Sequence, residues 1–476
     1  MTSLSVEMLA ADAVEPITSA GHAQLGIAVL AGIAVIVLLI TKFKVHAFLA
    51  LTIGSLALGA FAGAPLDKVI TSFTAGLGST VAGVGVLIAL GAILGKLLAD
   101  SGGADQIVDT ILAKAGGRSM PWAMVLIASV IGLPLFFEVG IVLLIPVVLM
   151  VAKRGNYSLM RIGIPALAGL SVMHGLIPPH PGPLVAIDAV GANLGVTLAL
   201  GVLVAIPTVI IAGPLFSKVA ARWVDIPVPE KMLQTSSDGP SDALDKRPSK
   251  DVAKLPSFGA TIATVLLPVV LMLSKALVDI VVDNPEHTVQ RVFDVIGSPL
   301  IALLAAVVVG MFTLGRAAGF SKGKITATVE KSLAPIAGIL LIVGAGGGFK
   351  QTLIDSGVGQ MVLEISEDWA IPALLLAWLI AVVIRLATGS ATVATVSAAG
   401  LVAPLAADMS TTHAALLVLA IGAGSLFFSH VNDAGFWLVK EYFGMNVGQT
   451  IKTWSTMETI ISVVAGGLVL LLSLII

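Results

Sequence analysis

The chain has 476 residues, of which 57% are hydrophobic and 11% are charged, and its mean hydropathy is +1.05. An average soluble domain carries about 25% charged residues, so this composition excludes a soluble globular protein and indicates a polytopic protein of the lipid bilayer. The chain contains no Cys, which excludes disulfides and thiolate chemistry, and its formal net charge of −2 argues against a nucleic-acid partner.

The N-terminal segment, residues 1–22, is predicted to be a tail outside the membrane. It contains acidic residues but no Lys or Arg, so it lacks the basic region of a secretory signal peptide. Lys42 and Lys44 follow the first apolar run, and basic loops remain in the cytoplasm. We therefore expect an external N-terminus, followed by scaffold spans in residues 23–78.

Residues 79–215 are predicted to form the first of two repeats. Its apolar sequence is interrupted by Gly132-Leu-Pro-Leu-Phe-Phe-Glu138-Val-Gly140. The basic residues on both sides of this stretch fall in the cytoplasm only if the chain enters and leaves the membrane on one face. Residues 132–140 are therefore interpreted as the tip of a re-entrant hairpin. The following segment, 216–257, carries seven Lys and Arg residues and is predicted to be a cytoplasmic loop.

Residues 258–332 are predicted to be linking scaffold spans, and residues 333–476 to be the second repeat, with its hairpin tip near 385–392. The sequence Asp100-Ser-Gly102 aligns with Asp355-Ser-Gly357, and the interrupted segments follow in the same order. Counting crossings gives the repeats inverted topology and places the C-terminus outside. Interrupted apolar segments at matching places in two halves are typical of secondary transporters. The predicted fold is all-α, with two inverted repeats, re-entrant hairpins, broken helices and scaffold helices.

Glu138 lies in a stretch where almost every neighbour is apolar. An ionised carboxylate in such a place is costly unless it is paired, so the side chain is expected to be protonated or partnered. A carboxyl at a hairpin tip can carry a coupling proton. The alternative is a structural Glu that accepts hydrogen bonds from amides at the turn.

The second hairpin tip contains Thr388, Gly389 and Ser390, in the sequence Ala387-Thr-Gly-Ser-Ala-Thr-Val393. Hydroxyls and free amides at a helix N-terminus favour an anion, so a carboxylate substrate suits this tip. The alternative is close packing of small residues between helices. Arg385 is a candidate counter-charge for an anionic substrate, or a partner of Glu138 or Asp433.

Two further breaks contain His residues at equivalent places in the repeats. The sequence His174-Gly-Leu-Ile-Pro-Pro-His180-Pro-Gly-Pro183 cannot form a continuous helix, because proline removes donors and clashes with preceding carbonyls. The second break brings His430 together with other polar residues, which are Ser429, Asn432 and Asp433. Such mixed donors and acceptors suit the hydroxyls of a polyol, and His174 and Asp433 are candidate proton carriers. The alternative for each His is a purely structural role.

These motifs, together with Ser429-His-Val-Asn-Asp-Ala-Gly435, resemble those of the gluconate permease family, within the larger ion transporter superfamily. The resemblance covers nearly the whole chain. It implies a proton symporter of the bacterial inner membrane for gluconate or a related sugar acid or hydroxy acid. It also implies inverted repeats, an elevator-like alternating-access motion and a homodimer. No cofactor or metal is implied, and the coupling ion would be the proton.

Several alternative functions are consistent with some of these sequence features. A carrier of the same fold for D-serine, ketodeoxygluconate or glycerate would show the same features. An intramembrane enzyme is a weaker hypothesis, because the chain has no Gly-x-Ser-x-Gly elbow, no His-Glu-x-x-His helix and no Cys. A passive channel would show conductance without uphill accumulation, and broken helices with an acid at a hairpin tip fit a gated carrier better.

Overall fold

The computed structural model describes residues 16–229, 254–282, 286–358, 361, 371–431 and 433–476, and the regular elements in these residues are all helices. Eight helical segments within them are long and apolar enough to cross a membrane. These segments are His22–Ile40, Leu66–Asp100, Leu159–Val190, Leu194–Trp223, Phe258–Asp279, Pro299–Arg316, Lys322–Asp355 and Val447–Leu472. Large apolar side chains such as Leu30 and Leu277 are exposed on them, as lipid contact requires. The predicted all-α polytopic class is confirmed.

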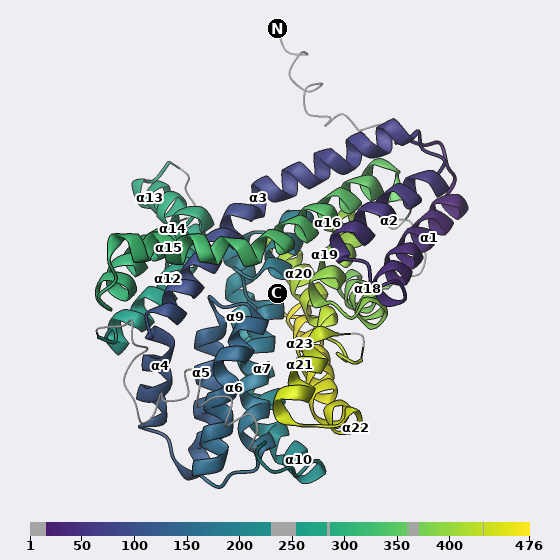
Figure 1. The fold of residues 1–476 in the computed structure, drawn as a ribbon. Helices are drawn as coiled ribbons and strands as arrows, with labels where there is room; N and C mark the ends of the chain where they lie inside the picture. The colour runs from purple at the N-terminus through teal and green to yellow at the C-terminus, as the bar shows by residue number, and fades with distance from the viewer. Residues whose placement is uncertain (1–15, 230–253, 283–285, 359–360, 362–370, 432) are drawn as a thin grey trace.

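The N-terminal helices are α1 (His22–Thr41), α2 (Ala47–Phe61) and α3 (Leu66–Asp100). Helices α1 and α2 lie at one side of the molecule, and α3 runs from there across its upper part (Figure 1). Helix α3 is 35 residues long, and no Pro interrupts it between residues 66 and 100. The boundary expected between residues 78 and 79 therefore falls inside a continuous helix.

The next helices include the first hairpin and the first broken helix. They are α4 (Gly103–Leu112), the 3₁₀ turn η1 (Gly117–Ser119), α5 (Met120–Gly132), α6 (Phe137–Arg154), α7 (Leu159–Leu176), α8 (Pro181–Val190), α9 (Leu194–Ile210), the π-helical turn η2 (Ile211–Leu215) and α10 (Phe216–Trp223). The wider π turn accommodates Pro214 without ending the helix. The segment expected to be a loop from residue 216 therefore begins as helix α10, and its residues 230–253 lie outside the described part of the chain.

The linking helices pack against the first half of the chain. They are α12 (Phe258–Val281), α13 (Thr288–Ile296), α14 (Pro299–Gly310), the π-helical turn η4 (Met311–Arg316), α15 (Lys322–Leu333) and the 3₁₀ turn η5 (Ala334–Ile336). Helix α12 contacts α9 and α14, and α15 contacts α3. These helices connect the two halves.

The C-terminal helices repeat the order of the first half. They are α16 (Ala337–Asp355), α18 (Ala373–Thr388), α19 (Ala391–Val402), the 3₁₀ turn η6 (Ala403–Ala406), α20 (Thr411–Ser425), α21 (Ala434–Phe443), α22 (Val447–Thr450), the π-helical turn η7 (Ile451–Ser455) and α23 (Thr456–Leu472). In each half a hairpin is followed by a broken helix and then by a helix with a π turn. This shared order supports the proposed repeat, whose inverted orientation stays a prediction.

The arms of the second hairpin are too short to span a bilayer. Helix α18 has 16 residues and α19 has 12. At a rise of about 1.5 Å per residue, α18 extends roughly 24 Å, against about 30 Å for the hydrocarbon core. We therefore expect the break between them to lie at membrane depth, where irregular backbone must be buried in protein or line a cavity.

A glycine-rich stretch of α16 lets the halves approach closely. Each residue of Gly346–Gly348 faces a neighbouring helix where an added Cβ would collide. Gly346 faces Val396 of α19, whereas Gly347 and Gly348 face α3. Glycine permits this close approach of the helices because it has no side chain. Helix α16 thus lies between α3 and the second hairpin, and Figure 1 shows it beside α3 across the upper part of the molecule.

Candidate functional site

Three helix breaks meet at one cavity of about 150 Å³. The breaks lie between α5 and α6, between α18 and α19, and between α20 and α21. The cavity is lined by Phe137, Ser171, His174, Arg385, Gly389, Ser390, Ala391, Thr392, Leu426, Asp433, Ala434, Gly435, Trp454 and Glu458. This volume is below the roughly 300–1,000 Å³ of drug-sized pockets, so it suits a small molecule.

The second hairpin turns at Gly389, which has a left-handed φ of 72° that residues with a side chain rarely adopt. Ser390 then caps α19, because its hydroxyl accepts a hydrogen bond from the Val393 amide at 3.3 Å. Ala391 and Thr392, in the first turn of α19, line the cavity. The sequence Thr-Gly-Ser therefore ends one helix and points the N-terminus of the next at the cavity.

The other two breaks also present helix N-termini. Phe137, the first residue of α6, lines the cavity. Asp433 caps α21 by accepting a hydrogen bond from the Gly435 amide at 2.8 Å. The N-terminus of a helix carries about half a positive charge, so three of them around one cavity favour a negatively charged ligand.

Arg385 and Asp433 form a buried ion pair beside the cavity. Their side chains are 4% and 14% exposed. Asp433 also accepts a hydrogen bond from the Ser429 hydroxyl, and Ser429 accepts one from Trp454 Nε1 at 2.7 Å. This network joins α18, the break before α21 and the final helical segment. Glu138 and Asp433 were the two partners expected for Arg385 within the protein, and in the structure Arg385 pairs with Asp433.

His174 and His180 connect the first hairpin to the first broken helix. His180 is 3% exposed, and its Nε2 donates to the Gly132 carbonyl, where α5 ends, at 2.7 Å. The two imidazole rings meet edge to face, with centroids 5.4 Å apart. His174 lines the cavity, whereas His180 supports the break behind it.

The structure brings part of the predicted site together. His174, Arg385, Gly389, Ser390 and Asp433 line the cavity.

The other predicted residues lie elsewhere. Thr388 is buried and donates to the Ile384 carbonyl of its own helix. Ser429 lies behind Asp433, and His430 packs at a tilt against Phe428 and is not part of the cavity lining. Asn432 and the side chain of Glu138 lie outside the described part of the chain. The binding and proton roles of all these residues stay predictions.

Sequence reasoning missed Glu458, in the first turn of α23. Its side chain is 1% exposed and lines the cavity, and the Ser171 hydroxyl of α7 hydrogen bonds to it. The signal available in the sequence was a single acid within an otherwise apolar terminal span. Sequence reasoning also did not single out Ser171 or Trp454.

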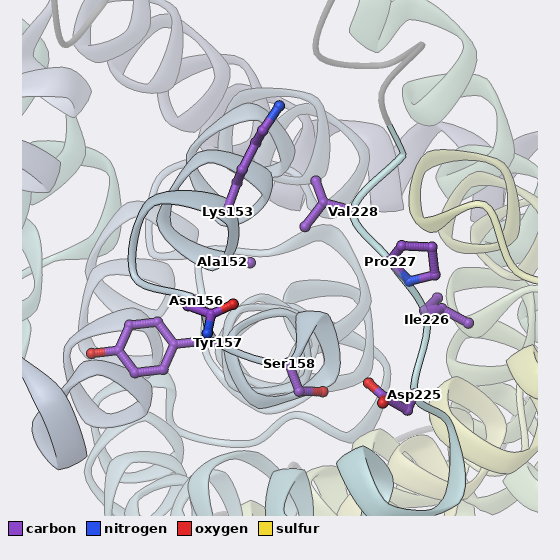
Figure 2. A pocket seen from close by; sticks show the side chains of 9 residues that line it. All are labelled: Ala152, Lys153, Asn156, Tyr157, Ser158, Asp225, Ile226, Pro227 and Val228. Carbon is purple, nitrogen blue, oxygen red and sulfur yellow. The ribbon is translucent and has the colours of Figure 1, made fainter.

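A larger cavity of about 430 Å³ lies between the end of α6, the start of α7 and the segment after α10 (Figure 2). Its charged residues, Lys153 and Asp225, are exposed. This cavity lacks the buried charges of the first, so the smaller cavity is the better candidate.

Comparison with known proteins gives one consistent family. The profile of the GntP permease family matches residues 25–475. A gluconate permease of Pseudomonas aeruginosa is 50% identical over 92% of this chain and 95% of its own length. A high-affinity gluconate transporter of Escherichia coli is 44% identical over 91% of this chain and 95% of its own. An L-idonate transporter of the same organism is 40% identical over 92% of this chain and 96% of its own length.

Two solved structures share the fold at low identity. MtrF of Neisseria gonorrhoeae superposes with a TM-score of 0.61 at 15% identity, over 85% of this chain and 83% of its own. The YdaH transporter of Alcanivorax borkumensis gives a TM-score of 0.54 at 17% identity, over 84% of this chain and 86% of its own.

Proposed function

Because the chain belongs to the GntP family of permeases, we propose that it is a secondary transporter that takes up gluconate or a closely related sugar acid together with protons. The gluconate and L-idonate transporters among its relatives support this substrate class. D-Serine, ketodeoxygluconate and glycerate are the alternative substrates.

The observation that carries the proposal is the convergence of three helix N-termini and the Arg385 guanidinium on one small cavity. These groups complement a carboxylate. The hydroxyls of Ser171, Ser390 and Thr392 lie in the same lining and can bond to the hydroxyls of a sugar acid. The site thus offers complementary chemistry to both parts of such a substrate.

The proposed mechanism is alternating access around this cavity. Both hairpin breaks lie at its wall, so movement of a hairpin would open or close it. The bundle that holds the cavity would then move as a rigid body, in an elevator-like step. Glu138, Asp433 and His174 are the proton-coupling groups proposed from the sequence, and Thr388, His180, Ser429, His430 and Asn432 are the substrate-binding residues proposed from it in addition to Gly389, Ser390 and Arg385.

We place the protein in the bacterial inner membrane as a homodimer, with both termini outside and residues 216–257 in the cytoplasm. The chain contains no Cys, so single cysteines can be introduced without a background. A membrane-impermeant maleimide applied to intact spheroplasts should label a cysteine at residue 12 but not one at residue 240. The reverse pattern would overturn this orientation.

The deciding experiment is uptake of labelled D-gluconate into proteoliposomes under an inward proton gradient, with and without sodium. L-Idonate, D-serine, ketodeoxygluconate and D-glycerate serve as competitors. Accumulation that requires the proton gradient and ignores sodium supports the proposal, and competition ranks the substrates. Accumulation of a competitor alone would replace the substrate, and accumulation of none would refute the symporter.

A further inference from the structure

Glu458 is a buried carboxyl in the transport cavity that the proposed mechanism does not yet use. It lies in the first turn of α23, directly after the π turn Ile451–Ser455, and is 1% exposed. The Ser171 hydroxyl hydrogen bonds to the carboxyl. Its Oε1 atom is buried and has no hydrogen-bond partner in the part of the chain that the structure describes. An acid with a free oxygen at the cavity wall is placed to act on what enters.

Among the described residues, the charged groups around Glu458 include no cation that pairs with it alone. The ones that face it are Arg385 of α18 and Asp433 before α21, and His174 of α7 lines the same cavity. Arg385 is already paired with Asp433. Arg161, also on α7, donates instead to the Ser217 hydroxyl at 2.8 Å and to the Pro214 carbonyl.

Asp433 differs from Glu458 in its hydrogen bonding. Its two carboxylate oxygens are engaged by Arg385, by the Ser429 hydroxyl and by the Gly435 amide. In this conformation Asp433 is paired with Arg385 and caps α21. Of the two carboxyls among the described residues that line this cavity, Glu458 is the one with an oxygen that has no hydrogen-bond partner.

We propose that an anionic substrate binds only when Glu458 is protonated, so that Glu458 links proton binding to substrate binding. This inference rests on the proposed function. With Glu458 ionised, the described side chains of the cavity hold two carboxylates against one guanidinium; with it protonated, they hold one of each. Two like charges roughly 6 Å apart at an effective dielectric constant of about 20 weaken binding about a hundredfold.

The linkage works in both directions. Because protonation favours the anion, the bound anion favours protonation by the same factor. The proton joins a Glu458 oxygen as the substrate enters from outside. The proton and the substrate anion, which together carry no net charge, then cross the membrane together. When the cavity opens to the cytoplasm, the substrate leaves and the O–H proton is released to water. Substrate and proton are thereby transported in the same direction.

The first test compares Glu458→Gln with Glu441→Gln, a matched change at an exposed carboxyl of α21. Gln imitates the protonated acid. We expect Glu458→Gln to bind gluconate and to exchange internal for external gluconate, but with binding that no longer depends on pH. Calorimetry in buffers of different ionisation enthalpy should give about one proton fewer per gluconate bound than in the wild type. Glu441→Gln should match the wild type in both measurements.

Two results with folded Glu458→Gln would overturn the inference. One is proton uptake on binding that equals the wild-type value, and the other is complete loss of gluconate binding. If wild-type protein accumulates none of the tested acids, the proposed function fails whatever Glu458 does. If the wild type accumulates gluconate and Glu458→Gln retains pH-linked binding, only this inference fails.

A second measurement uses wild-type protein, in case Glu458→Gln does not fold. An apolar carbodiimide reacts with protonated carboxyls at membrane depth, and the labelled residue is located by mass spectrometry. We expect labelling of Glu458 that falls as pH rises and that gluconate blocks. Gluconate-protected labelling at other carboxyls with none at Glu458 would overturn the inference.

Discussion

Replacing Arg385 by Met tests whether the buried ion pair holds the site together. Met keeps most of the volume of the side-chain stem but leaves Asp433 buried without its cation. Removing one partner of a buried pair costs about 3–5 kcal/mol, because the remaining charge stays desolvated. The two side chains are 4% and 14% exposed, so this range applies here rather than the smaller value of a surface pair.

The double variant Arg385→Met/Asp433→Asn separates the structural role of Arg385 from its binding role. It removes both charges, so it should recover at least about 2 kcal/mol of the loss in the single variant. Gluconate at a hundredfold excess over its dissociation constant should stabilise the wild type by about 2.7 kcal/mol. The double variant should lack this stabilisation, because it has lost the guanidinium that we propose binds the substrate carboxylate.

The assay is denaturant unfolding in detergent micelles, with and without gluconate. The control is Arg291→Gln, which breaks an exposed pair with Glu286 whose side chains are 61% and 82% exposed, and it should change stability by no more than about 1 kcal/mol. If Arg385→Met is as stable as the control, the ion pair does not support the fold. If the double variant still gains stability from gluconate, Arg385 is not the counter-charge of the substrate.

Three further changes probe the breaks around the cavity. Gly389→Ala forces a side chain into a left-handed turn of φ 72° and should destabilise the protein by roughly 1 kcal/mol and slow uptake, whereas equal melting temperature and rate would show that the turn relaxes. Trp454→Phe removes the 2.7 Å hydrogen bond to Ser429 and should cost about 1–2 kcal/mol in the same unfolding assay, with no loss contradicting the network. Glu138→Gln should keep gluconate exchange but lose pH-driven accumulation in proteoliposomes, and full accumulation would exclude Glu138 from coupling.

The sequence predicted the breaks well, because special residues cause them. The turn at Gly389 and the cap at Ser390 follow from backbone freedom and side-chain hydrogen bonding, which are local properties. The break before His180 follows in the same way from consecutive prolines.

The cavity lining was harder to predict, because it depends on contacts between distant segments. Glu458 stands alone in an apolar span, and only the packing of α23 against α7 brings it to Ser171. His430 was expected to line the binding site, at the break equivalent to that of His180. Its ring instead packs at a tilt against Phe428, whose left-handed φ of 42° turns the backbone just before it. Sequence patterns do not encode such a local turn in a residue that rarely adopts it.

The three consecutive glycines of α16 allow its contact with the second hairpin and its contact with α3 to be changed one at a time by mutation. Gly346→Ala would push against Val396 and so against the second hairpin, whereas Gly348→Ala would push against Phe73 of α3. Adjacent residues of one helix point in different directions, so one added methyl group selects which neighbour is displaced. A pair of single-methyl variants two residues apart can thus distinguish motion of the hairpin from motion of the scaffold in the transport cycle.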